Sequence, residues 1–401
     1  MKVNWVNIPE VLFFQEGPGV RKWQFKDKGV KLLNGGNINK GKLNLSSTKL
    51  YLSEEEAYGK YNHFLADEGD LIFACSGVVV DNFHNKITFV KKEHLPLCMN
   101  TSTMRFKVLD ESIIDIVYVK YYLQTRLFSG QLRRLITGSA QLNFGPSHIK
   151  KIKIPLPSLS EQKRIAGILD AADSYRQKTK ALIAKYDALT QSLFLDMFGD
   201  PITNPLGWDM FTNDDINIKI VDCPHSTPKY VDSISNYPCI RTSEIKNGSI
   251  EWKSMKYLNK ENHIERIARL EPLEDDLIFG REGLVGEIAL IPKNISISLG
   301  QRVMLFRVNK KIILPLFYHA LIMSNGIQQK IKSKTIGATV KRINIKDVKL
   351  IELPVPPLTL QNQFADRVAV IEKQKALAQD SLVQAEDLFN SLLQKAFKGE
   401  L

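Results

Sequence analysis

The sequence predicts a protein of mixed α and β structure with a pseudo-two-fold internal duplication. Two α/β-type domains are separated by two long helices, which we expect to form an antiparallel coiled coil. Three observations support this fold class. Segments of the first half recur in the second half, each copy ends in a long segment with helical apolar spacing, and each copy begins with short apolar runs typical of strands. With 401 residues, of which 44% are hydrophobic, the chain can form two cores.

The internal repeat is the strongest pattern. Pro155–Leu159 recurs 199 residues later as Pro354–Leu358, and the same offset holds from Gly138 to Phe198. Upstream, Asp70–Phe73 matches Asp276–Phe279 at an offset of 206. We infer a tandem duplication with copies that meet near residues 199–201. The predicted domains are 1–157 and 200–356 for the two mixed domains, and 158–199 and 357–401 for the helical segments.

Within the mixed domains, the strands and helices are predicted from apolar patterning. Short strands should follow acidic turns, edge strands should precede the long helices, and one amphipathic helix should lie in each domain. The expected strands are Ile72–Phe73, Leu277–Phe279, Lys151–Ile154 and Lys349–Leu353, and the expected helices are Ile114–Leu127 and Leu314–Ser324.

The two long segments are predicted to be helices of about 60 Å. Ser160–Phe198 contains no proline, and its apolar residues alternate by three and four, as in a coiled-coil seam. Mutual antiparallel pairing is favoured over independent docking of each helix on its own domain. Ser158 with Glu161 fits a capping box, and Thr359 is the expected cap in the second copy. The residues assigned to helix pairing and partner docking are Ile165, Ile168, Ala172, Tyr186, Leu189, Leu193, Phe364, Ile371, Leu382, Leu388 and Leu392, and the seam also includes Tyr175 and Leu182.

The composition limits the classes of function. Lys and Arg total 55 against 43 Asp and Glu, which gives a net charge of +12 and favours a polyanionic partner, although a generally basic protein is an alternative. The four cysteines are too far apart for a zinc ribbon or a disulfide framework. The N-terminus does not resemble a signal peptide, and no apolar run approaches the ~18 residues of a membrane span. We expect a cytoplasmic protein without a metal site.

Catalytic motifs are missing from the sequence. It contains no phosphate-binding Gly-x-x-x-x-Gly-Lys-Ser/Thr loop, no dinucleotide fingerprint and no Asn-Pro-Pro-aromatic tetrapeptide. Glu244 and Lys246 superficially resemble part of a nuclease metal site, but surface charges on a strand are the better interpretation. His225 near Asp222 could act as a general base, although a turn residue that faces DNA is favoured. No catalytic residue is assigned.

DNA contact is the remaining interpretation. The loop around Gln141 and Asn143 matches the loop that ends at Lys341 and Arg342. Amide side chains suit adenine edges, and cationic ones suit guanine or phosphate. Arg281 is expected to be exposed between two glycines. Each of these positions could also be an ordinary turn or a solvated charge. The full set of candidate DNA-binding residues is Ser76, Arg133, Arg134, Gln141, Asn143, His225, Arg241, Arg281, Lys334, Lys341 and Arg342.

The order of these parts resembles the specificity subunit (HsdS) family of Type I restriction-modification systems, over almost the whole chain. Leu159–Ile165 at the start of the first long helix and Leu388–Leu401 at the end of the second are similar to that family. Tyr61–Phe64, Gly69–Phe73 and Asn100–Thr101 look like one type of its recognition domains. Residues 222–245 look like another type.

The resemblance implies two target-recognition domains, each of which reads one half of a bipartite asymmetric DNA site. The helices would set the spacer between the half-sites and bind two methyltransferase subunits, and an endonuclease/translocase would complete the complex. S-adenosylmethionine, ATP and Mg²⁺ would be bound by those partners, and this chain would hold no cofactor. The alternatives are an autonomous DNA-acting enzyme, recognisable by cleavage with the purified chain, and a DNA-binding adaptor of another complex.

Overall fold

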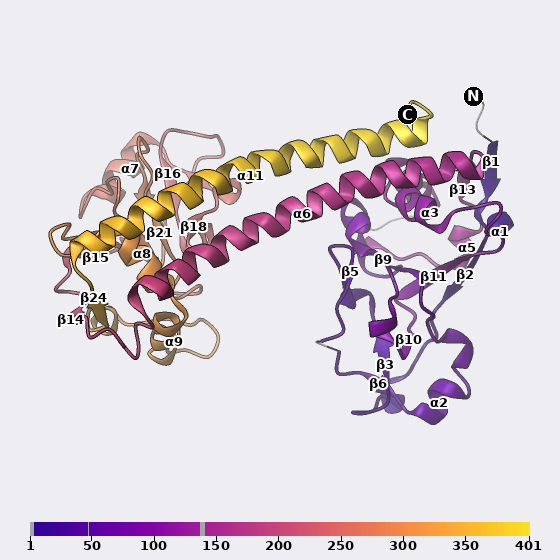
Figure 1. Cartoon of the computed structure of the whole chain (residues 1–401), viewed down its shortest axis with the longest axis horizontal. Coiled ribbons are helices and arrows are strands. Elements are labelled where there is room, and N and C mark those ends of the chain that lie inside the picture. Colours follow the sequence, from indigo (N-terminus) through magenta and orange to yellow (C-terminus); the bar gives the residue numbers. More distant parts are fainter. Residues whose placement is uncertain (1–3, 47, 137–140) are drawn as a thin grey trace. The chain divides into compact units, whose positions relative to one another are not determined.

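The computed structural model describes residues 4–46, 48–136 and 141–401. The chain divides into two compact units, one formed by Met1–Lys180 with Asp380–Leu401 and the other by Ala181–Gln379. Each unit contains a mixed domain, called here the first or second head, and parts of two long helices (Figure 1). These helices are α6 (Leu159–Phe198) and α11 (Leu358–Lys398).

The first head is built on a four-stranded antiparallel sheet with strand order β2-β11-β7-β9. Its central strand β7 carries the predicted apolar run, and all four of its residues are buried. Smaller sheets of order β10-β3-β6, β1-β13, β4-β5 and β12-β8 complete the head. The strands are β1 (Asn4–Asn7), β2 (Leu12–Glu16), β3 (Val30–Leu33), β4 (Ile38–Asn39), β5 (Lys42–Leu43), β6 (Tyr51–Leu52), β7 (Leu71–Ala74), β8 (Val78–Val79), β9 (Ile87–Phe89), β10 (Leu97–Met99), β11 (Thr103–Val108), β12 (Gln141–Leu142) and β13 (Lys153–Leu156).

Helices of the first head pack on this sheet. The expected helix from Ile114 to Leu127 is a shorter helix, because Asp115 caps its start by accepting a hydrogen bond from Tyr118 N. Thr125 then caps the next helix in the same way by accepting from Phe128 N. The helices are α1 (Ile8–Val11), α2 (Glu54–Tyr58), α3 (Ile116–Leu123), α4 (Arg126–Leu135) and α5 (Pro146–Ile149).

The second head repeats this topology. Its main sheet has the order β15-β23-β20-β21, its parallel-containing sheet has the order β19-β16-β22, and the pairs β14-β24 and β17-β18 match β1-β13 and β4-β5. The strands are β14 (Asp209–Thr212), β15 (Asn217–Asp222), β16 (Pro238–Ile240), β17 (Ile245–Lys246), β18 (Ser249–Ile250), β19 (Lys256–Tyr257), β20 (Leu277–Gly280), β21 (Ile288–Leu290), β22 (Ser298–Leu299), β23 (Val303–Val308) and β24 (Glu352–Val355), and the helices are α7 (Lys260–Ile267), α8 (Pro315–Met323), α9 (Asn325–Ser333) and α10 (Ile345–Lys349).

The helices α6 and α11 pair antiparallel within each unit. In the first unit, Arg164 Nη2 donates to Leu401 O over 3.0 Å, and the Lys180–Glu386 ion pair closes at 2.7 Å. The partner number falls as the α6 number rises, which defines the antiparallel direction. In the second unit, Lys375 pairs with Asp187 at 2.7 Å. The predicted antiparallel pairing of two long helices is therefore confirmed.

The seam of α11 follows the predicted positions except at Leu388, and the seam of α6 differs in its middle. Leu189 and Leu388 are 49% and 53% exposed, so their assignment to helix pairing is wrong. Tyr175 and Leu182 are exposed as well. The predicted spacing passes through position 179, and Thr179 is indeed only 6% exposed. On either side of it the half-buried residues are Arg176, Ile183 and Thr190, each one position after the predicted Tyr175, Leu182 and Leu189. Hydrophobic spacing alone therefore selected the wrong face at these positions, because part of the true seam is polar.

The helix starts also test the capping predictions. Ser158 Oγ accepts from Glu161 N over 3.3 Å, as expected for a cap of α6. The expected Thr359 cap is wrong, because α11 already begins at Leu358 and Thr359 lies inside its first turn. Leu360 N instead donates to Pro357 O over 3.0 Å.

A buried glutamine joins each head to the helix that follows it. Gln162 is 0% exposed. It accepts from Asp115 N over 2.9 Å and donates to Ile113 O and Pro157 O over 3.0 and 2.9 Å. Gln361 is also 0% exposed and repeats these bonds, with Leu314 N as its donor and Ile312 O and Pro356 O as its acceptors. Every partner atom is a backbone atom, so these hydrogen bonds do not depend on the side chains of the head.

Candidate nucleic-acid interface

One edge of the main sheet gathers the candidate residues in each head. Strands β2 and β7 end and β11 begins at the same edge, because the strands are antiparallel. In the second head, β15, β20 and β23 meet in the same way. We call this region the loop edge. It comprises residues 16–19, 34–35, 75–77, 100–102 and 143 in the first head, and 222–225, 241–242, 281–283, 300–302 and 341–342 in the second.

In the first head, Ser76 and Asn143 are brought together by the pairing of β8 with β12. Asn143 Oδ1 accepts from Ser76 Oγ over 2.9 Å and from Gly77 N over 2.8 Å. A backbone N–H can only donate, so the amide orientation is fixed and Nδ2 is the group left for a ligand. A bidentate adenine contact needs both amide atoms and would require Oδ1 to leave these partners, and the adenine preference of Asn143 stays a prediction. Gln141 lies in β12, but its side chain is outside the described part of the chain.

Three further polar residues complete this edge. Asn100 Oδ1 accepts from Ser102 Oγ over 2.6 Å, and Ser102 Oγ accepts from Gly35 N over 2.9 Å. The Asn100 amide also donates to Asn34 Oδ1. Sequence reasoning did not select Asn34 or Ser102 as contact residues. The available signal was the polar turn that follows each short apolar strand.

In the second head, Arg281 lies in a network of charges. Its Nε lies 3.2 Å from Asp222 Oδ1, and its Nη2 lies 2.8 Å from Glu282 Oε1. Only 14% of the Arg281 side chain is exposed, so the expectation of an exposed arginine is wrong. Its ion pairs with Asp222 and Glu282 hold the guanidinium against the loop edge. His225 is 72% exposed, with Nε2 3.5 Å from Asp222 Oδ2.

Lys341 and Arg342 are exposed, and their backbone is tied to the same turn. Gly283 N donates to Lys341 O over 2.8 Å, and Arg342 bridges to Ile336 through a pair of 2.8 Å backbone hydrogen bonds. Arg302, which sequence reasoning missed, joins them from the start of β23. Its side chain is 55% exposed, and its Nε lies 3.7 Å from Glu282 Oε2.

Arg241 is held in place by a buried carboxylate. Its guanidinium donates to Glu244 through Nε at 2.9 Å and Nη2 at 2.5 Å, and this bonding raises the pKa of Arg241. Glu244 is 0% exposed, so the interpretation of Glu244 as a surface strand charge is wrong. The carboxylate is buried because it caps the turn at Arg241 N and neutralises the arginine. Arg241 also lies over the ring of Tyr230, 5.6 Å from its centroid.

The remaining candidates lie on helices. Arg133 and Arg134 are in the last turn of α4, and Lys334 follows α9 directly. Arg134 is exposed and Lys334 is half-buried. Their placement outside the edge loops separates them from the other candidates, and their role in DNA binding stays a prediction.

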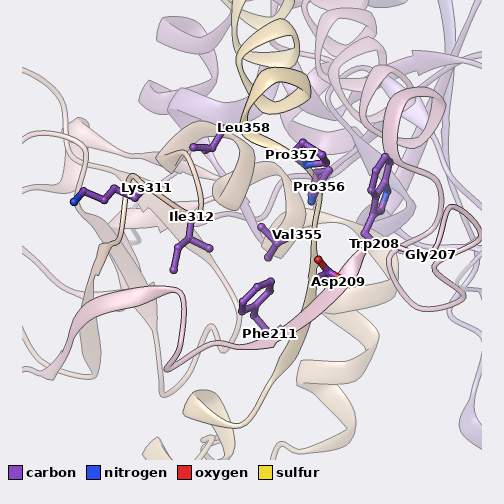
Figure 2. Close-up of a pocket in the computed structure, with 10 residues that line it drawn as sticks. All are labelled: Gly207, Trp208, Asp209, Phe211, Lys311, Ile312, Val355, Pro356, Pro357 and Leu358. Atoms are coloured by element: carbon purple, nitrogen blue, oxygen red, sulfur yellow. The ribbon is translucent and has the colours of Figure 1, made fainter.

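Metal-ligating clusters and surface hollows bear on whether the chain binds a small molecule. Among the described residues, no group of three or more His, Cys, Asp or Glu could hold a metal ion. In the same part of the chain, no helix is long and apolar enough to cross a membrane. Figure 2 shows a surface hollow of the second head, where Phe211, Ile312 and Val355 lie near Trp208. It lies beside the backbone atoms that Gln361 binds, so it belongs to the head–helix junction.

The comparison with protein families decides the identity. The model of the "Type I restriction modification DNA specificity domain" matches the chain twice, over residues 6–185 and 205–386. The chain belongs to the family of Type I restriction-modification specificity subunits. The predicted family, the duplicated fold and the non-catalytic specificity role are confirmed by this membership.

Individual relatives agree with this assignment. The EcoKI specificity subunit of Escherichia coli strain K12 is 24% identical over 94% of this chain and 83% of its own length. The EcoBI specificity subunit of Escherichia coli is 25% identical over 62% of this chain, and the match spans 58% of that relative. Among solved structures, the S subunit from M. genitalium has a TM-score of 0.54 at 16% identity, covering 99% of this chain and 96% of its own, and supports the fold.

Proposed function

We propose that each head of this specificity subunit binds one half of a bipartite, asymmetric double-stranded DNA site at its loop edge. The observation that supports this proposal is that the two heads share one backbone scaffold but carry different side chains at their loop edges. Arg302 and Arg342 belong to the second edge, where the first has Ser102 and Asn143. Two different half-sites require this combination of similar support and different contact residues.

The long helices are proposed as the spacer between the half-sites. Each is a single uninterrupted helix, and one added turn of about four residues lengthens a helix by ~6 Å. Inserting four residues into both helices is therefore expected to change the number of unread base pairs and leave both half-sites intact. Mapping of N6-methyladenine in host DNA measures this change. A changed half-site sequence would contradict the spacer role.

The partners of the subunit are DNA and the methyltransferase and restriction subunits of its system. That one chain binds two methyltransferase subunits is our proposal, supported by the two similar units. Exposed apolar residues on the helices suit such docking, including Leu189 in the second unit and Leu388 in the first. A cytoplasmic location follows from this role and is proposed with it.

Comparison of the methylome with and without this gene tests the central proposal. We expect N6-methyladenine to disappear from one bipartite motif when the gene is deleted. Removal of either head should abolish site-specific methylation. If the methylome is unchanged while the methyltransferase is expressed, the subunit does not direct DNA modification, and a DNA-binding adaptor of another complex becomes the better interpretation.

A further inference from the structure

The two loop edges can be aligned through backbone hydrogen bonds that recur in both heads. Cys75 N donates to Ser102 O over 2.9 Å, and Arg281 N donates to Arg302 O over the same distance. The residue after Asn143 donates to Cys75 O, just as the residue after Arg342 donates to Arg281 O. Turns closed by Asn37 and Glu244 align a fourth position. The equivalent pairs are Asn34 and Arg241, Cys75 and Arg281, Ser102 and Arg302, and Asn143 and Arg342.

At these four positions the second head has arginine each time, whereas the first head has none. Two of the carboxylates beside these arginines are absent from the first head. Glu282 stands where the first head has Ser76, and Glu244 stands where it has Asn37, whereas Asp222 has a carboxylate counterpart in Glu16. The second edge therefore presents arginine–carboxylate ion pairs, and the first presents amides and hydroxyls beside one carboxylate that has no arginine partner among the aligned positions.

Two of the four arginines are exposed to solvent and so accessible to a ligand. Arg241 and Arg281 are only 28% and 14% exposed and are tied to carboxylates. Arg302 is 55% exposed, and Arg342 is exposed as well. Arg302 has a φ of 67°, a left-handed backbone conformation that is strained for an arginine. Such a conformation persists where the surrounding structure enforces it, which is typical of contact residues.

We propose that the second head reads guanine through Arg302 and Arg342, whereas the first head reads its half-site at the equivalent positions without an arginine–guanine contact. This inference rests on the proposed function. Guanine presents N7 and O6 side by side in the major groove, and these acceptors match the two parallel donors of a guanidinium. Asn143 can offer only its Nδ2 group, which makes a single contact to one acceptor.

The carboxylate beside Arg302 favours a base over a phosphate. Glu282 Oε2 lies 3.7 Å from Arg302 Nε, where it would repel a phosphate bound to that arginine. A G·C pair instead shows a donor, cytosine N4, next to the guanine acceptors. Arg302 and Glu282 together match the donor and acceptor pattern of one G·C pair. Lys341, which has no such fork, is the better candidate for a phosphate contact.

The test uses the full chain in its complex with methyltransferase subunits. Methylomes of cells carrying wild type, Arg302→Gln, Arg342→Gln and the two Arg→Lys variants give the base tolerated at each position. Asn143→Ala identifies the half-site of the first head. The control is Lys293→Gln, an exposed cation that pairs with Glu274, ahead of β20 and so away from the loop edge. Purified complexes are then assayed on duplexes with 7-deazaguanine, which lacks N7.

We expect each Arg→Gln and Arg→Lys variant to accept other bases at a guanine of one half-site, with discrimination reduced about 10- to 100-fold. The half-site relaxed by Asn143→Ala should be unchanged. 7-Deazaguanine at that position should slow the wild type and leave the Arg→Gln variant unaffected. Lys293→Gln should match the wild type.

Three results would overturn the inference. They are uniform weakening at all sites with rescue by lysine, unchanged specificity in all four variants, and a second half-site without guanine. If no methylation depends on the wild-type gene, the proposed function itself fails, and the inference that rests on it fails with it. If a glutamine variant does not fold, the lysine variant and the 7-deazaguanine duplexes still decide the matter.

Discussion

The first and second heads share a scaffold down to individual hydrogen bonds, yet they differ in almost every residue at the loop edge. Gln162 and Gln361 make the same three backbone contacts in both. At the edge, arginines held by carboxylates in the second head replace amides and hydroxyls in the first. The residues that hold the backbone of each head in place are therefore different from the residues proposed to contact DNA. Mutations can change stability and DNA specificity separately.

The largest expected difference within the shared scaffold concerns its buried ion pair. Arg105 and Asp70 are 7% and 2% exposed, whereas Arg307 and Asp276 are 24% and 5% exposed. Arg105→Met should lower the free energy of unfolding by about 3–5 kcal/mol, since it removes four hydrogen bonds of the guanidinium and leaves the buried Asp70 carboxylate with Lys107 as its remaining cationic partner. Arg307→Met should cost less because water reaches that pair. Urea denaturation with hydrogen exchange resolved for each head measures both.

Lys107→Met is the matched control for the first head. Lys107 also contacts Asp70, at 3.3 Å from Oδ1, but its side chain is 35% exposed. Its loss should cost no more than about 1 kcal/mol. Equal losses for Arg105 and Lys107 would show that burial does not set the strength of this pair.

The junction glutamines test whether the scaffolds are energetically equivalent. Gln162→Ala and Gln361→Ala each remove three hydrogen bonds to buried backbone atoms, and each should cost about 2–4 kcal/mol. The two losses should agree within about 1 kcal/mol. Denaturation of the single variants measures them, and a large difference would break the equivalence of the two heads.

Acidification should destabilise the second head more than the first, whereas loss of the buried arginine should destabilise the first head more than the second. Burial lowers the pKa of His263 and His319, both in the second head. These rings stay neutral in the folded state, while unfolded histidine takes up a proton below about pH 6.5. Their contribution is therefore complete above that pH and is lost as the pH falls toward the lowered pKa. Hydrogen exchange between pH 7 and 5 should show the second head losing more protection.

His319→Gln provides the control for this titration, because glutamine can still donate to Gly248 O and does not titrate. The variant should reduce the acid sensitivity of the second head. In the first head, burial also lowers the pKa of His94, with the Glu93 carboxylate opposing the shift as Glu271 and Glu372 do for the histidines of the second head. The second head is expected to lose more protection because it contains two such histidines. A first head that loses more protection than the second would contradict the prediction.

The smallest effect on stability is expected at the exposed leucines. Leu189→Ser and Leu388→Ser should change the free energy of unfolding by no more than about 0.5 kcal/mol each, since both side chains face solvent. If they dock methyltransferase subunits, both should weaken assembly of the complex, which analytical ultracentrifugation measures. Phe194→Ala, which removes a buried ring, is the contrasting control and should cost about 3–5 kcal/mol.

Much of the fold could be predicted from the sequence because the duplication compares the chain with itself. Repeated apolar runs gave β7, β20 and both long helices. The seam of α6 was misplaced by one residue at Tyr175 and Leu189, because the half-buried neighbours Arg176 and Thr190 are polar and periodicity counts apolar residues only. The Thr190 hydroxyl donates to Tyr186 O over 3.3 Å, so partial burial costs it no hydrogen bond.

The loop edge was only partly predictable. Ser76, Asn143, Arg281 and Arg342 were all selected as candidates, but the structure and not the sequence shows that Ser76 lies beside Asn143 and Arg281 beside Arg342. Whether each of these side chains is exposed or paired was not predicted from the sequence. Whether an arginine is exposed or drawn toward a carboxylate depends on Asp222, which precedes Arg281 by 59 residues. Arg302 was missed because nothing local distinguishes it from an ordinary strand-entry residue.

The junction glutamines have a consequence for how such a chain can change its target. Gln162 and Gln361 bind only main-chain atoms of the heads, so a head of different sequence and the same backbone would keep these hydrogen bonds. The head–helix boundary is thus a natural point for exchanging genetic segments. A recombination event there would deliver a new half-site in one step if the incoming head keeps the rings that pack on the helices, as Tyr118 and Tyr122 pack on Phe397 in the first head.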